Sequence, residues 1–512
     1  MKKQINQLRA GVVLSYINLA LSSLIPFFYT PVMLRMLGEA EYGLYSLSSS
    51  VINYLSLLTF GFGSTIVRYI TIFRASNEKE KEEKVFGFFL ALYCGIAIIV
   101  IICGLAIANN VDSIFHKGLL PEEIKKMYIL ILIMTFNSAL SFPISVFSSV
   151  IMSHEKYIFR RLVDMFLTII APIGNLVALY LGYASVGMAV SSTIIQFIML
   201  PVNVIYCLKV LKIRPKLSIL PKAMIKEMLG FSIFVFIGTI VDMLFWSTDK
   251  VILGMMASST AVAIYNIGGT FNGMVTSLST SISGVLTPRI TTIVAQDAEK
   301  EELTELFIRV GRIQYLVVAL VISGFSVFGQ DFLTLWAGNK FENSYWIAVL
   351  TLFPLCIPLI QNTGVSIVVA QNRHQFRSIV YLIIAIINVI STYYVVPYLG
   401  GIGAALCSGI SYVVGQGIIM NVYYYKITGI DIPLFWKNIF SMSKVPVLML
   451  IIGIVINHYI DFISWFSFFI AVVIYIMCYV IFMYRFEMND YERNILKAPI
   501  SKIIIKLRRK RS

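Results

Sequence analysis

Long apolar stretches alternate with short polar breaks along the whole chain. Each stretch is close to the roughly 20 residues that an α-helix needs to cross the hydrocarbon core of a bilayer. The apolar residues are continuous, whereas the strands of a membrane β-barrel would alternate between apolar and polar positions. Fourteen stretches fit this description, at residues 10–34, 42–70, 85–109, 126–152, 162–181, 186–208, 229–255, 259–288, 304–335, 344–370, 377–397, 402–425, 442–460 and 463–484. The pattern predicts an all-α polytopic membrane protein with about 14 transmembrane helices.

Composition and charge agree with this pattern and add an orientation. Hydrophobic residues make up 58% of the 512 positions, and charged residues make up 13%. If the N-terminus is cytoplasmic, 35 of the 41 Lys and Arg residues fall in cytoplasmic ends and loops, and five fall outside. Since positive charge collects on the cytoplasmic side of membrane proteins, we expect both termini to be cytoplasmic. The same rule explains the net charge of +15, so we expect no nucleic acid among the partners.

The two halves of the chain resemble each other. SVIMSHEKYIFRRLV corresponds to SIVVAQNRHQFRSIV, and this alignment places Phe159 on Phe376 and Arg160 on Arg377, at an offset of 217 residues. A repeat of six helices keeps the same orientation in both copies, which predicts two bundles around a shared cleft. The predicted organisation is an N-terminal lobe at 1–215 (helices 1–6), a C-terminal lobe at 216–428 (helices 7–12), helices 13 and 14 at 429–485 and a basic cytoplasmic tail at 486–512.

The charged residues that cost most to insert lie in one stretch, Gly230 to Met255. Asp242 is near its middle, and Asp249 and Lys250 are toward its far end. An ionised side chain at the centre of a bilayer costs about 2.5–3.5 kcal/mol, so such groups usually face a protein interior or a water-filled cavity. We interpret the two aspartates as candidates for ion coupling, and the lysine as a candidate phosphate-binding cation. The alternatives are structural hydrogen bonding for the carboxylates and outward snorkelling for the lysine.

Further polar residues at helix ends and in mid-helix complete the candidate site. Guanidinium groups bind phosphate through paired hydrogen bonds and keep their charge, and the candidates of this kind are Arg35, Arg68 and Arg289. Asn53 and Asn272 are candidates for lining a cleft and binding sugar hydroxyls. Each residue also has an ordinary interpretation, because arginines anchor helix ends at the interface and asparagines hydrogen-bond neighbouring helices.

Several classes of function are disfavoured. The chain has no Gly-Lys dipeptide and hence no P-loop, which argues against direct drive by ATP. The longest outer loop, near residues 110–125, is too short for an extramembrane active site. The six cysteines and four histidines are scattered without metal-ligand spacing. We therefore expect no enzyme activity, no metal and no cofactor beyond a coupling ion, H⁺ or Na⁺.

Several motifs, taken in order, resemble one family. They are MLGEAEYGLYS between the first two helices, FGFGSTIVRYI in the second, STDKVILG at the end of the seventh, GQDFLTLWAG at the end of the ninth and LGGIGAA before the twelfth. Together they are similar to the polysaccharide-exporter branch of the multidrug/oligosaccharidyl-lipid/polysaccharide (MOP) transporter superfamily, over nearly the whole chain. One position departs from the pattern, because this chain has Phe60 where relatives often carry an acidic residue.

The resemblance implies a MATE-like fold of two pseudo-symmetric six-helix lobes plus two C-terminal helices. It also implies an O-antigen (Wzx-type) or capsule flippase of lipopolysaccharide or exopolysaccharide biosynthesis. Such a protein moves a polyprenyl-diphosphate-linked oligosaccharide from the inner to the outer leaflet of the bacterial plasma (inner) membrane by alternating access. The implied partners are this substrate, membrane lipids, and polysaccharide polymerase and chain-length proteins. Three alternatives stay open: a peptidoglycan lipid precursor flippase, a MATE-like multidrug antiporter and a non-transporting assembly scaffold.

Overall fold

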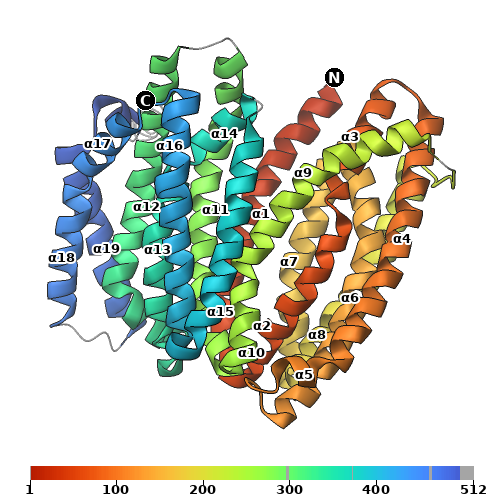
Figure 1. The fold of residues 1–512 in the computed structure, drawn as a ribbon, viewed down its shortest axis with the longest axis horizontal. Coiled ribbons are helices and arrows are strands. Elements are labelled where there is room, and N and C mark those ends of the chain that lie inside the picture. Colours follow the sequence, from red (N-terminus) through yellow and green to blue (C-terminus); the bar gives the residue numbers. More distant parts are fainter. Residues whose placement is uncertain (1, 219, 296–298, 372, 460–463, 496–512) are drawn as a thin grey trace, which may run out of the picture. The chain divides into compact units, whose positions relative to one another are not determined.

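The computed structural model describes residues 2–218, 220–295, 299–371, 373–459 and 464–495 (Figure 1). The regular elements of this part of the chain are all helical. By their contacts they form two compact units, each of which is described by itself. Unit 1 consists of Met1–Asn266 together with Ala385–Ala404, and unit 2 of Ile267–Ile384 together with Ala405–Ser512. Most of the predicted basic tail, from residue 496 on, lies outside the described residues.

Unit 1 is built around α6, which other helices cover on several sides. Its elements are α1 (Lys2–Leu37), α2 (Glu39–Asn53), a 3₁₀ turn (Tyr54–Thr59), α3 (Phe62–Ala75), α4 (Lys79–Asn109), α5 (Val111–Phe115), α6 (Pro121–Ser153), α7 (Tyr157–Tyr180), α8 (Ala184–Ile205), a π-helical segment (Tyr206–Leu211), α9 (Lys222–Trp246) and α10 (Thr248–Met256). α6 packs against α2, α3, α4 and α8, and α1 packs against α7. Val146 and Val150, one turn apart on α6, are both 0% exposed, as expected for a helix at the centre of a bundle.

α12 has the central place in unit 2. Its elements are α11 (Ser259–Ala295) from Ile267 on, α12 (Lys300–Trp336), a 3₁₀ turn (Asn339–Phe341), α13 (Ser344–Ile360), α14 (Asn362–Ala370), α15 (His374–Tyr412) without Ala385–Ala404, a π-helical segment (Val413–Met420), α16 (Asn421–Tyr423), a second π-helical segment (Tyr424–Thr428), α17 (Ile432–Met442), α18 (Lys444–Asn457), α19 (Trp465–Phe482) and a third π-helical segment (Met483–Glu487). α12 packs against α13, α17, α18 and α19. At its core the rings of Phe307 and Phe435 lie 4.7 Å apart, and both residues are fully buried.

The number of helical stretches that could cross a membrane is close to the number that the sequence pattern predicts. Twelve helical stretches in the described part of the chain are long and apolar enough to cross a membrane. One of them, Gln375–Thr428, has 54 residues. A straight helix of this length would span about 80 Å, far more than the roughly 30 Å of a hydrocarbon core. It bends at Gly400 (φ 52°, ψ −137°) and so holds two crossings. α11, with 37 residues, adds a helix of spanning length. The all-α polytopic fold is confirmed, and the predicted count of about fourteen crossings stays a prediction.

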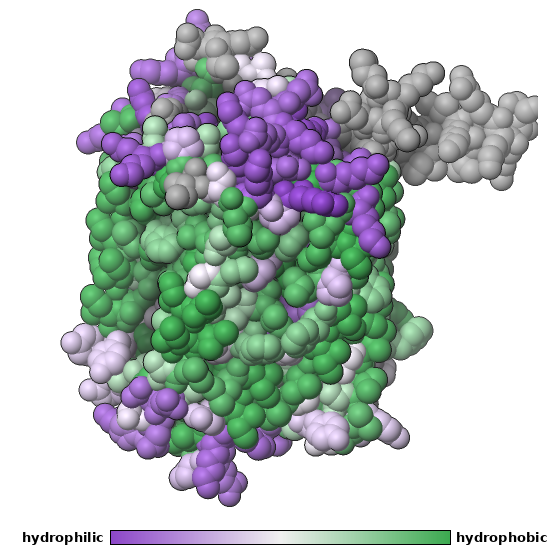
Figure 2. Space-filling model, turned by 90° about the vertical axis from the view of Figure 1, so that its right-hand side faces the viewer, coloured by the Kyte–Doolittle hydropathy of each residue, from purple (hydrophilic) through white to green (hydrophobic). Residues whose placement is uncertain are grey.

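The surface of unit 1 carries a broad apolar band. On the face shown in Figure 2, hydrophobic residues fill the middle and hydrophilic residues gather at the two ends. Ile98 and Ile102 of α4 are 61% and 60% exposed, although both side chains are aliphatic. Exposed aliphatic side chains over such a band are typical of a surface that faces lipid.

The two repeats end their last helices in the same way. Each helix passes into a π-helical segment, which ends before a residue with a left-handed backbone. The backbone amide of the residue after it donates to the carbonyl oxygen six residues earlier, and the distance from nitrogen to oxygen is 3.2 Å in both repeats. The matched residues are Lys212 (φ 56°) and Gly429 (φ 77°), with the hydrogen bonds Ile213 to Cys207 and Ile430 to Tyr424. All matched positions lie 217 residues apart, which is the offset that the sequence alignment predicts. The duplication is therefore visible in backbone detail as well as in sequence.

Two predicted spans are interrupted. The span predicted at 42–70 consists of α2, a 3₁₀ turn and α3, and the span predicted at 229–255 consists of α9 and α10, which separate at Ser247. Both stretches are still long and apolar enough to cross a membrane, and the breaks within them are a feature that the apolar pattern does not show. α9 and α10, which follow the predicted lobe boundary at residue 215, make their contacts within unit 1.

Candidate functional site

The two interruptions lie against each other in unit 1. The phenol of Tyr54, in the 3₁₀ turn after α2, forms a hydrogen bond with the hydroxyl of Thr248, the first residue of α10. Broken helices place polar backbone and side-chain groups inside the membrane, and in transporters they commonly form binding sites. The contact between α2–α3 and α9–α10 is therefore the candidate functional site.

Gly61 permits the close approach of these elements. Phe60 and Gly61 both have left-handed backbones (φ 48° and 68°), so the chain turns sharply before α3. A Cβ atom on Gly61 would lie 2.7 Å from Cγ1 of Val235 on α9, which is too close. Glycine thus suits both the backbone conformation and the helix contact. The rings of Phe60 and Phe236 then pack with centroids 4.8 Å apart.

The contact extends in both directions from the breaks. Toward α9, the hydroxyls of Thr65 and Ser232 are 2.6 Å apart. Toward the end of α10, a Cβ atom on Gly254 would come within 2.4 Å of the side chain of Leu47. Small and hydroxyl-bearing residues let helices in membranes pack closely and hydrogen-bond across the contact. α9 therefore packs along α3 on one side of the breaks, and α10 packs along α2 on the other side.

Side-chain hydrogen bonds hold the chain that follows α10. The hydroxyl of Ser259, at the start of α11, donates to Oε1 of Glu123 on α6 at 2.5 Å. Nδ2 of Asn266 donates to the hydroxyl of Tyr42 on α2 at 2.6 Å. These bonds tie the beginning of α11 to two helices of the first repeat.

Asp249 and Lys250 come directly after the break between α9 and α10. Asp249 is fully buried, and its carboxylate accepts a hydrogen bond from the hydroxyl of Tyr265. Lys250 is half-buried and makes no ion pair or hydrogen bond with the residues that the structure describes. The neighbouring Asp249 carboxylate attracts this ammonium group without forming an ion pair with it, and a half-buried ammonium group without an ion pair is unfavourable in a membrane until an anion binds to it. The surroundings of Lys250 therefore suit an anionic ligand.

Asp242 is in a different setting from Asp249. It is exposed and belongs to α9, whereas Asp249 is buried and belongs to α10. Because the helix breaks at Ser247 between them, their spacing of seven residues does not place them on one face of one helix. The ion-coupling roles of both residues stay predictions.

Three further predicted residues of unit 1 are exposed. Arg35 lies in the last turn of α1, Asn53 ends α2, and Arg68 belongs to α3. The guanidinium of Arg68 is 5.9 Å from the ring centroid of Tyr69. Asn53 directly precedes Tyr54 and so flanks the contact between the broken helices. The structure brings Asn53 and Lys250 to this contact, and it leaves the two arginines on the surface of the unit.

The other two predicted residues belong to α11. Asn272 is buried in unit 2 and donates through its amide to the hydroxyl of Thr351 on α13 at 2.9 Å. This hydrogen bond joins two helices, which is the ordinary interpretation of such an asparagine. The side chain of Arg289 lies outside the described residues.

The hydroxyl pairs that connect the broken helices are not marked by any pattern in the sequence. Tyr54 and Thr248 are 194 positions apart, and Thr65 and Ser232 are 167 apart. Hydroxyl residues are common in apolar spans, so composition alone does not mark these four. The glycine in FGFGS was the available signal, since Gly61 begins the turn into α3.

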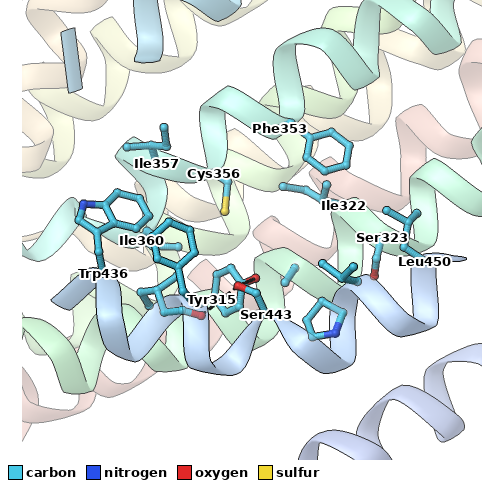
Figure 3. Close-up of a pocket in the computed structure, with 15 residues that line it drawn as sticks. Tyr315, Ile322, Ser323, Phe353, Cys356, Ile357, Ile360, Trp436, Ser443 and Leu450 are labelled. Atoms are coloured by element: carbon cyan, nitrogen blue, oxygen red, sulfur yellow. Dashed lines mark hydrogen bonds between the residues drawn. The ribbon is translucent and has the colours of Figure 1, made fainter. Parts of the chain in front are cut away.

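Unit 2 contains an apolar pocket among α12, α13, α17 and α18 (Figure 3). Its volume is about 230 Å³, and its lining is mostly aliphatic and aromatic. The main polar feature is the hydrogen bond between the hydroxyls of Tyr315 and Ser443, 2.6 Å apart. No predicted site residue lines it, and its composition suits hydrocarbon rather than an anion.

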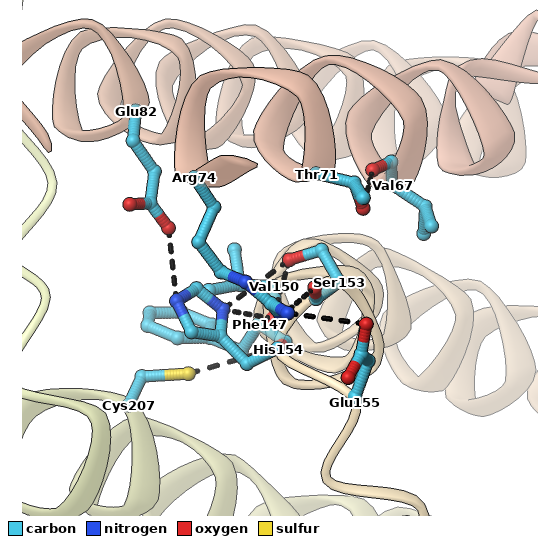
Figure 4. Close-up of polar contacts among 10 residues, drawn as sticks. All are labelled: Val67, Thr71, Arg74, Glu82, Phe147, Val150, Ser153, His154, Glu155 and Cys207. Carbon is cyan, nitrogen blue, oxygen red and sulfur yellow. Dashed lines mark hydrogen bonds and ion pairs between the residues drawn. The ribbon is translucent and has the colours of Figure 1, made fainter. Parts of the chain in front are cut away.

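A charged cluster joins α3, α4 and α6 (Figure 4). Nε2 of His154 lies 3.0 Å from Oε1 of Glu82, and Arg74 pairs with Glu155 at 3.1 Å. Nδ1 of His154 lies 2.9 Å from the carbonyl oxygen of Val150. A carbonyl only accepts, so Nδ1 donates to it. Glu82 belongs to the mixed-charge run at residues 74–84 and is nevertheless buried, with 4% of its surface exposed.

Duplicated bundles of spanning helices, with polar and charged residues at paired helix breaks, define a class of protein: a polytopic membrane protein with the architecture of a transporter. The model of the polysaccharide biosynthesis protein family matches residues 8–294, so the chain belongs to that family.

Relatives of known sequence or structure agree with this assignment. The chain is 22% identical over 493 residues to the uncharacterized membrane protein EpsK of Bacillus subtilis (strain 168). The aligned region covers 93% of this chain and 94% of EpsK. It is similar to the lipid II flippase MurJ in an inward closed conformation, with a TM-score of 0.73, 16% identity and coverage of 95% of this chain and 100% of that one. It is also similar to an inward-facing MATE family transporter, with a TM-score of 0.64, 15% identity and coverage of 82% and 99%. The chain shares the fold of these two proteins, the second of which is a transporter of the MOP superfamily.

Proposed function

We propose that the protein is a flippase that moves a polyprenyl-diphosphate-linked oligosaccharide from the inner to the outer leaflet by alternating access. The substrate would be the repeat unit of an O-antigen, capsule or exopolysaccharide. The family description, polysaccharide biosynthesis protein, supports the substrate class, and the shared fold with a lipid II flippase supports the transport of a lipid-linked molecule. The observation that carries the proposal is Lys250, a half-buried cation without a described carboxylate partner at a break in a spanning helix.

The diphosphate is the part of such a substrate that hydrocarbon excludes most strongly. An ion pair with Lys250 would neutralise part of this charge and would offset the unfavourable burial of the ammonium group. Arg35, Arg68 and Arg289 remain candidates for additional phosphate contacts, and Asn53 and Asn272 for contacts with sugar hydroxyls. The polyprenyl tail would remain in the lipid throughout.

Ion coupling is a separate part of the proposal. Asp249 is enclosed by protein next to Lys250, so a bound H⁺ or Na⁺ would change the charge beside the substrate-binding lysine. Asp242 is the second candidate, on the other side of the break. Binding of a cation by Asp249 would weaken its attraction for Lys250 and make the lysine more available to the diphosphate.

The proposed cellular setting is the bacterial plasma membrane, as the similarity to polysaccharide biosynthesis proteins suggests. The gathering of Lys and Arg at the loops on one side supports cytoplasmic positions for both termini. A polysaccharide polymerase and chain-length proteins would act on the product in the outer leaflet.

A peptidoglycan lipid precursor is the second candidate substrate. It is favoured by the TM-score of 0.73 to the lipid II flippase MurJ. Both substrates present a diphosphate to the same lysine, and they differ in the attached sugars.

The experiment is a leaflet-movement assay in proteoliposomes that contain only this protein. A fluorescent polyprenyl-diphosphate oligosaccharide would be supplied in one leaflet, with and without a gradient of H⁺ or Na⁺. We expect movement above that of protein-free vesicles. Lys250→Ala should weaken substrate binding about tenfold, as the loss of one charge-assisted hydrogen bond predicts. Lys117→Ala, at an exposed lysine, is the matched control.

The outcomes separate the candidates. Movement of the oligosaccharide lipid but not of lipid II supports the proposed substrate, and the reverse result supports the second candidate. An absence of movement with correctly folded protein and several sugar lipids would contradict the flippase proposal. Equal affinity in Lys250→Ala and wild type would exclude this lysine from the binding site.

A further inference from the structure

The duplication allows the same corner of the two repeats to be compared. In the first repeat, Phe159 stacks on Tyr206 with ring centroids 3.6 Å apart and planes at 12°. In the second, Phe376 stacks on Tyr423 at 4.4 Å and 10°. Each residue lies 217 positions from its counterpart, so the residues beside the two stacks can be compared position by position.

Arg160, next to the first stack, has a carboxylate partner. Its Nη2 lies 3.1 Å from Oδ1 of Asp164, one turn later on α7. Its Nη1 donates to Oγ of Ser148 at 2.7 Å. The positive charge at this corner of the first repeat is therefore neutralised within the protein.

Arg377, the equivalent of Arg160, lacks such a partner. The position of Asp164 is occupied by Tyr381, and the guanidinium of Arg377 lies over its ring, 4.7 Å from the centroid. The hydroxyl of Tyr381 donates to Gln416. Nε of Arg377 is buried without a hydrogen-bond partner, and no described carboxylate lies within ion-pair distance of the guanidinium. A buried guanidinium donor of this kind is unfavourable until an acceptor reaches it.

Two more cations lie at the same corner of unit 2. Arg373 directly precedes α15, Lys426 lies in the π-helical segment Tyr424–Thr428, and both are exposed. The hydroxyl of Tyr423 donates to the carbonyl of Arg373 at 3.2 Å, and Arg373 donates to the carbonyl of Ile427 at 2.8 Å, which holds the two chain segments together. Asp431, the acidic residue that follows in the chain, is occupied in capping the start of α17.

We propose that Arg377, with Arg373 and Lys426, forms a phosphate-binding site in unit 2 that has no counterpart at Arg160. A guanidinium group matches the geometry of a phosphate and stays charged, and two flanking cations add attraction. Arg377 lies in the first turn of a spanning helix, where the phosphates of lipid headgroups are within reach. The phosphate comes either from an anionic phospholipid or from a soluble phosphate. This site is separate from Lys250 and does not depend on the proposed substrate.

The test measures thermal unfolding of the full chain in detergent micelles while a phosphate ligand is titrated. The three ligands are phosphatidylglycerol, phosphatidylcholine as the zwitterionic control, and inorganic pyrophosphate. The variants are Arg377→Gln, the matched control Arg160→Gln, and Tyr381→Asp, which recreates the carboxylate of the first repeat beside an intact Arg377. We expect phosphatidylglycerol to protect wild type and Arg160→Gln equally, and Arg377→Gln to need about tenfold more lipid for half of the effect.

The response of the variants to each ligand distinguishes lipid phosphate from soluble phosphate and tests whether the site exists. Protection by phosphatidylglycerol that is lost in Arg377→Gln assigns the site to lipid phosphate, and protection by pyrophosphate that is lost in the same variant assigns it to soluble phosphate. Tyr381→Asp should lose the protection too, because the new carboxylate would form an ion pair with the guanidinium of Arg377. If Arg377→Gln does not fold, the response of Tyr381→Asp tests the proposed site in its place. An equal response of Arg377→Gln, Tyr381→Asp and wild type to every ligand would overturn the proposal.

Discussion

Charged side chains in this protein fall into two groups, those with a protein partner and those without a described carboxylate. Glu82 is buried against His154, and Asp249 is buried and accepts a hydrogen bond from a tyrosine. Lys250 and Arg377 are cations without a described carboxylate within ion-pair distance. Because a buried charge without a partner is costly, the first group is expected to serve stability and the second to gain most from a bound anion.

Tyr265→Phe tests the first group at Asp249. The substitution removes the hydroxyl that donates to a fully buried carboxylate and keeps the ring. We expect a loss of about 1.5–3 kcal/mol of stability, because hydrogen bonds to charged groups are stronger than neutral ones. The measurement is thermal or denaturant unfolding in detergent, with Tyr425→Phe at a 55% exposed tyrosine as the control. Equal stability of the two variants would show that Asp249 does not depend on this hydroxyl.

The Glu82–His154 pair is suited to a double-mutant cycle. Removing one partner of a buried ion pair leaves the other charge uncompensated, and we expect Glu82→Gln and His154→Ala each to cost about 3 kcal/mol. The double variant should lose clearly less than the two single losses together, since it leaves no isolated charge. The exposed Glu305–Arg309 pair provides the comparison, with an expected coupling below about 1 kcal/mol. Additive losses at Glu82 and His154 would mean that the two side chains do not interact energetically.

At the scale of the elements, the break between α2 and α3 depends on one glycine. Gly61→Ala would force a side chain into a left-handed backbone (φ 68°) and place its Cβ 2.7 Å from Val235. We expect a loss of at least about 1–2 kcal/mol from the backbone alone, together with a displacement of α9. Gly63→Ala is the matched control, because that glycine is helical and its nearest neighbour would be 3.9 Å away. If unfolding experiments find the two variants equally stable, the tight contact at Gly61 is not required.

The elements differ in how far the sequence predicts them. The spans and the repeat were predictable, because apolar length and the offset from Phe159 to Phe376 are properties of the sequence itself. The break at Ser247 was not predictable, because neither proline nor glycine marks it. The hydrogen bond between Tyr54 and Thr248 joins residues that are 194 positions apart, and such a contact cannot be read from the sequence. Lys250 was recognisable from the cost of a charge in a span, whereas its lack of a described partner required the folded chain.

At the scale of the whole molecule, the contact between α2–α3 and α9–α10 connects the first repeat to the beginning of the second. It contains small residues, hydroxyl pairs and two helix breaks, and it carries Lys250 and Asp249. Contacts of this kind can separate without exposing a large apolar core, unlike the aliphatic packing around Val146 on α6. If the protein works by alternating access, this contact is where its two repeats would part.

Cross-linking this contact tests that idea directly. The hydroxyls of Thr65 and Ser232 are 2.6 Å apart, so cysteines at both positions would be close enough for a disulfide. We expect oxidation to stop leaflet movement of the lipid-linked oligosaccharide and a reductant to restore it, because the covalent bond prevents α3 and α9 from separating. Each single cysteine variant, treated with the same oxidant, controls for the native cysteines. Full transport by protein that is completely cross-linked would show that this end of the contact stays closed throughout the cycle, and the moving interface would then have to lie elsewhere.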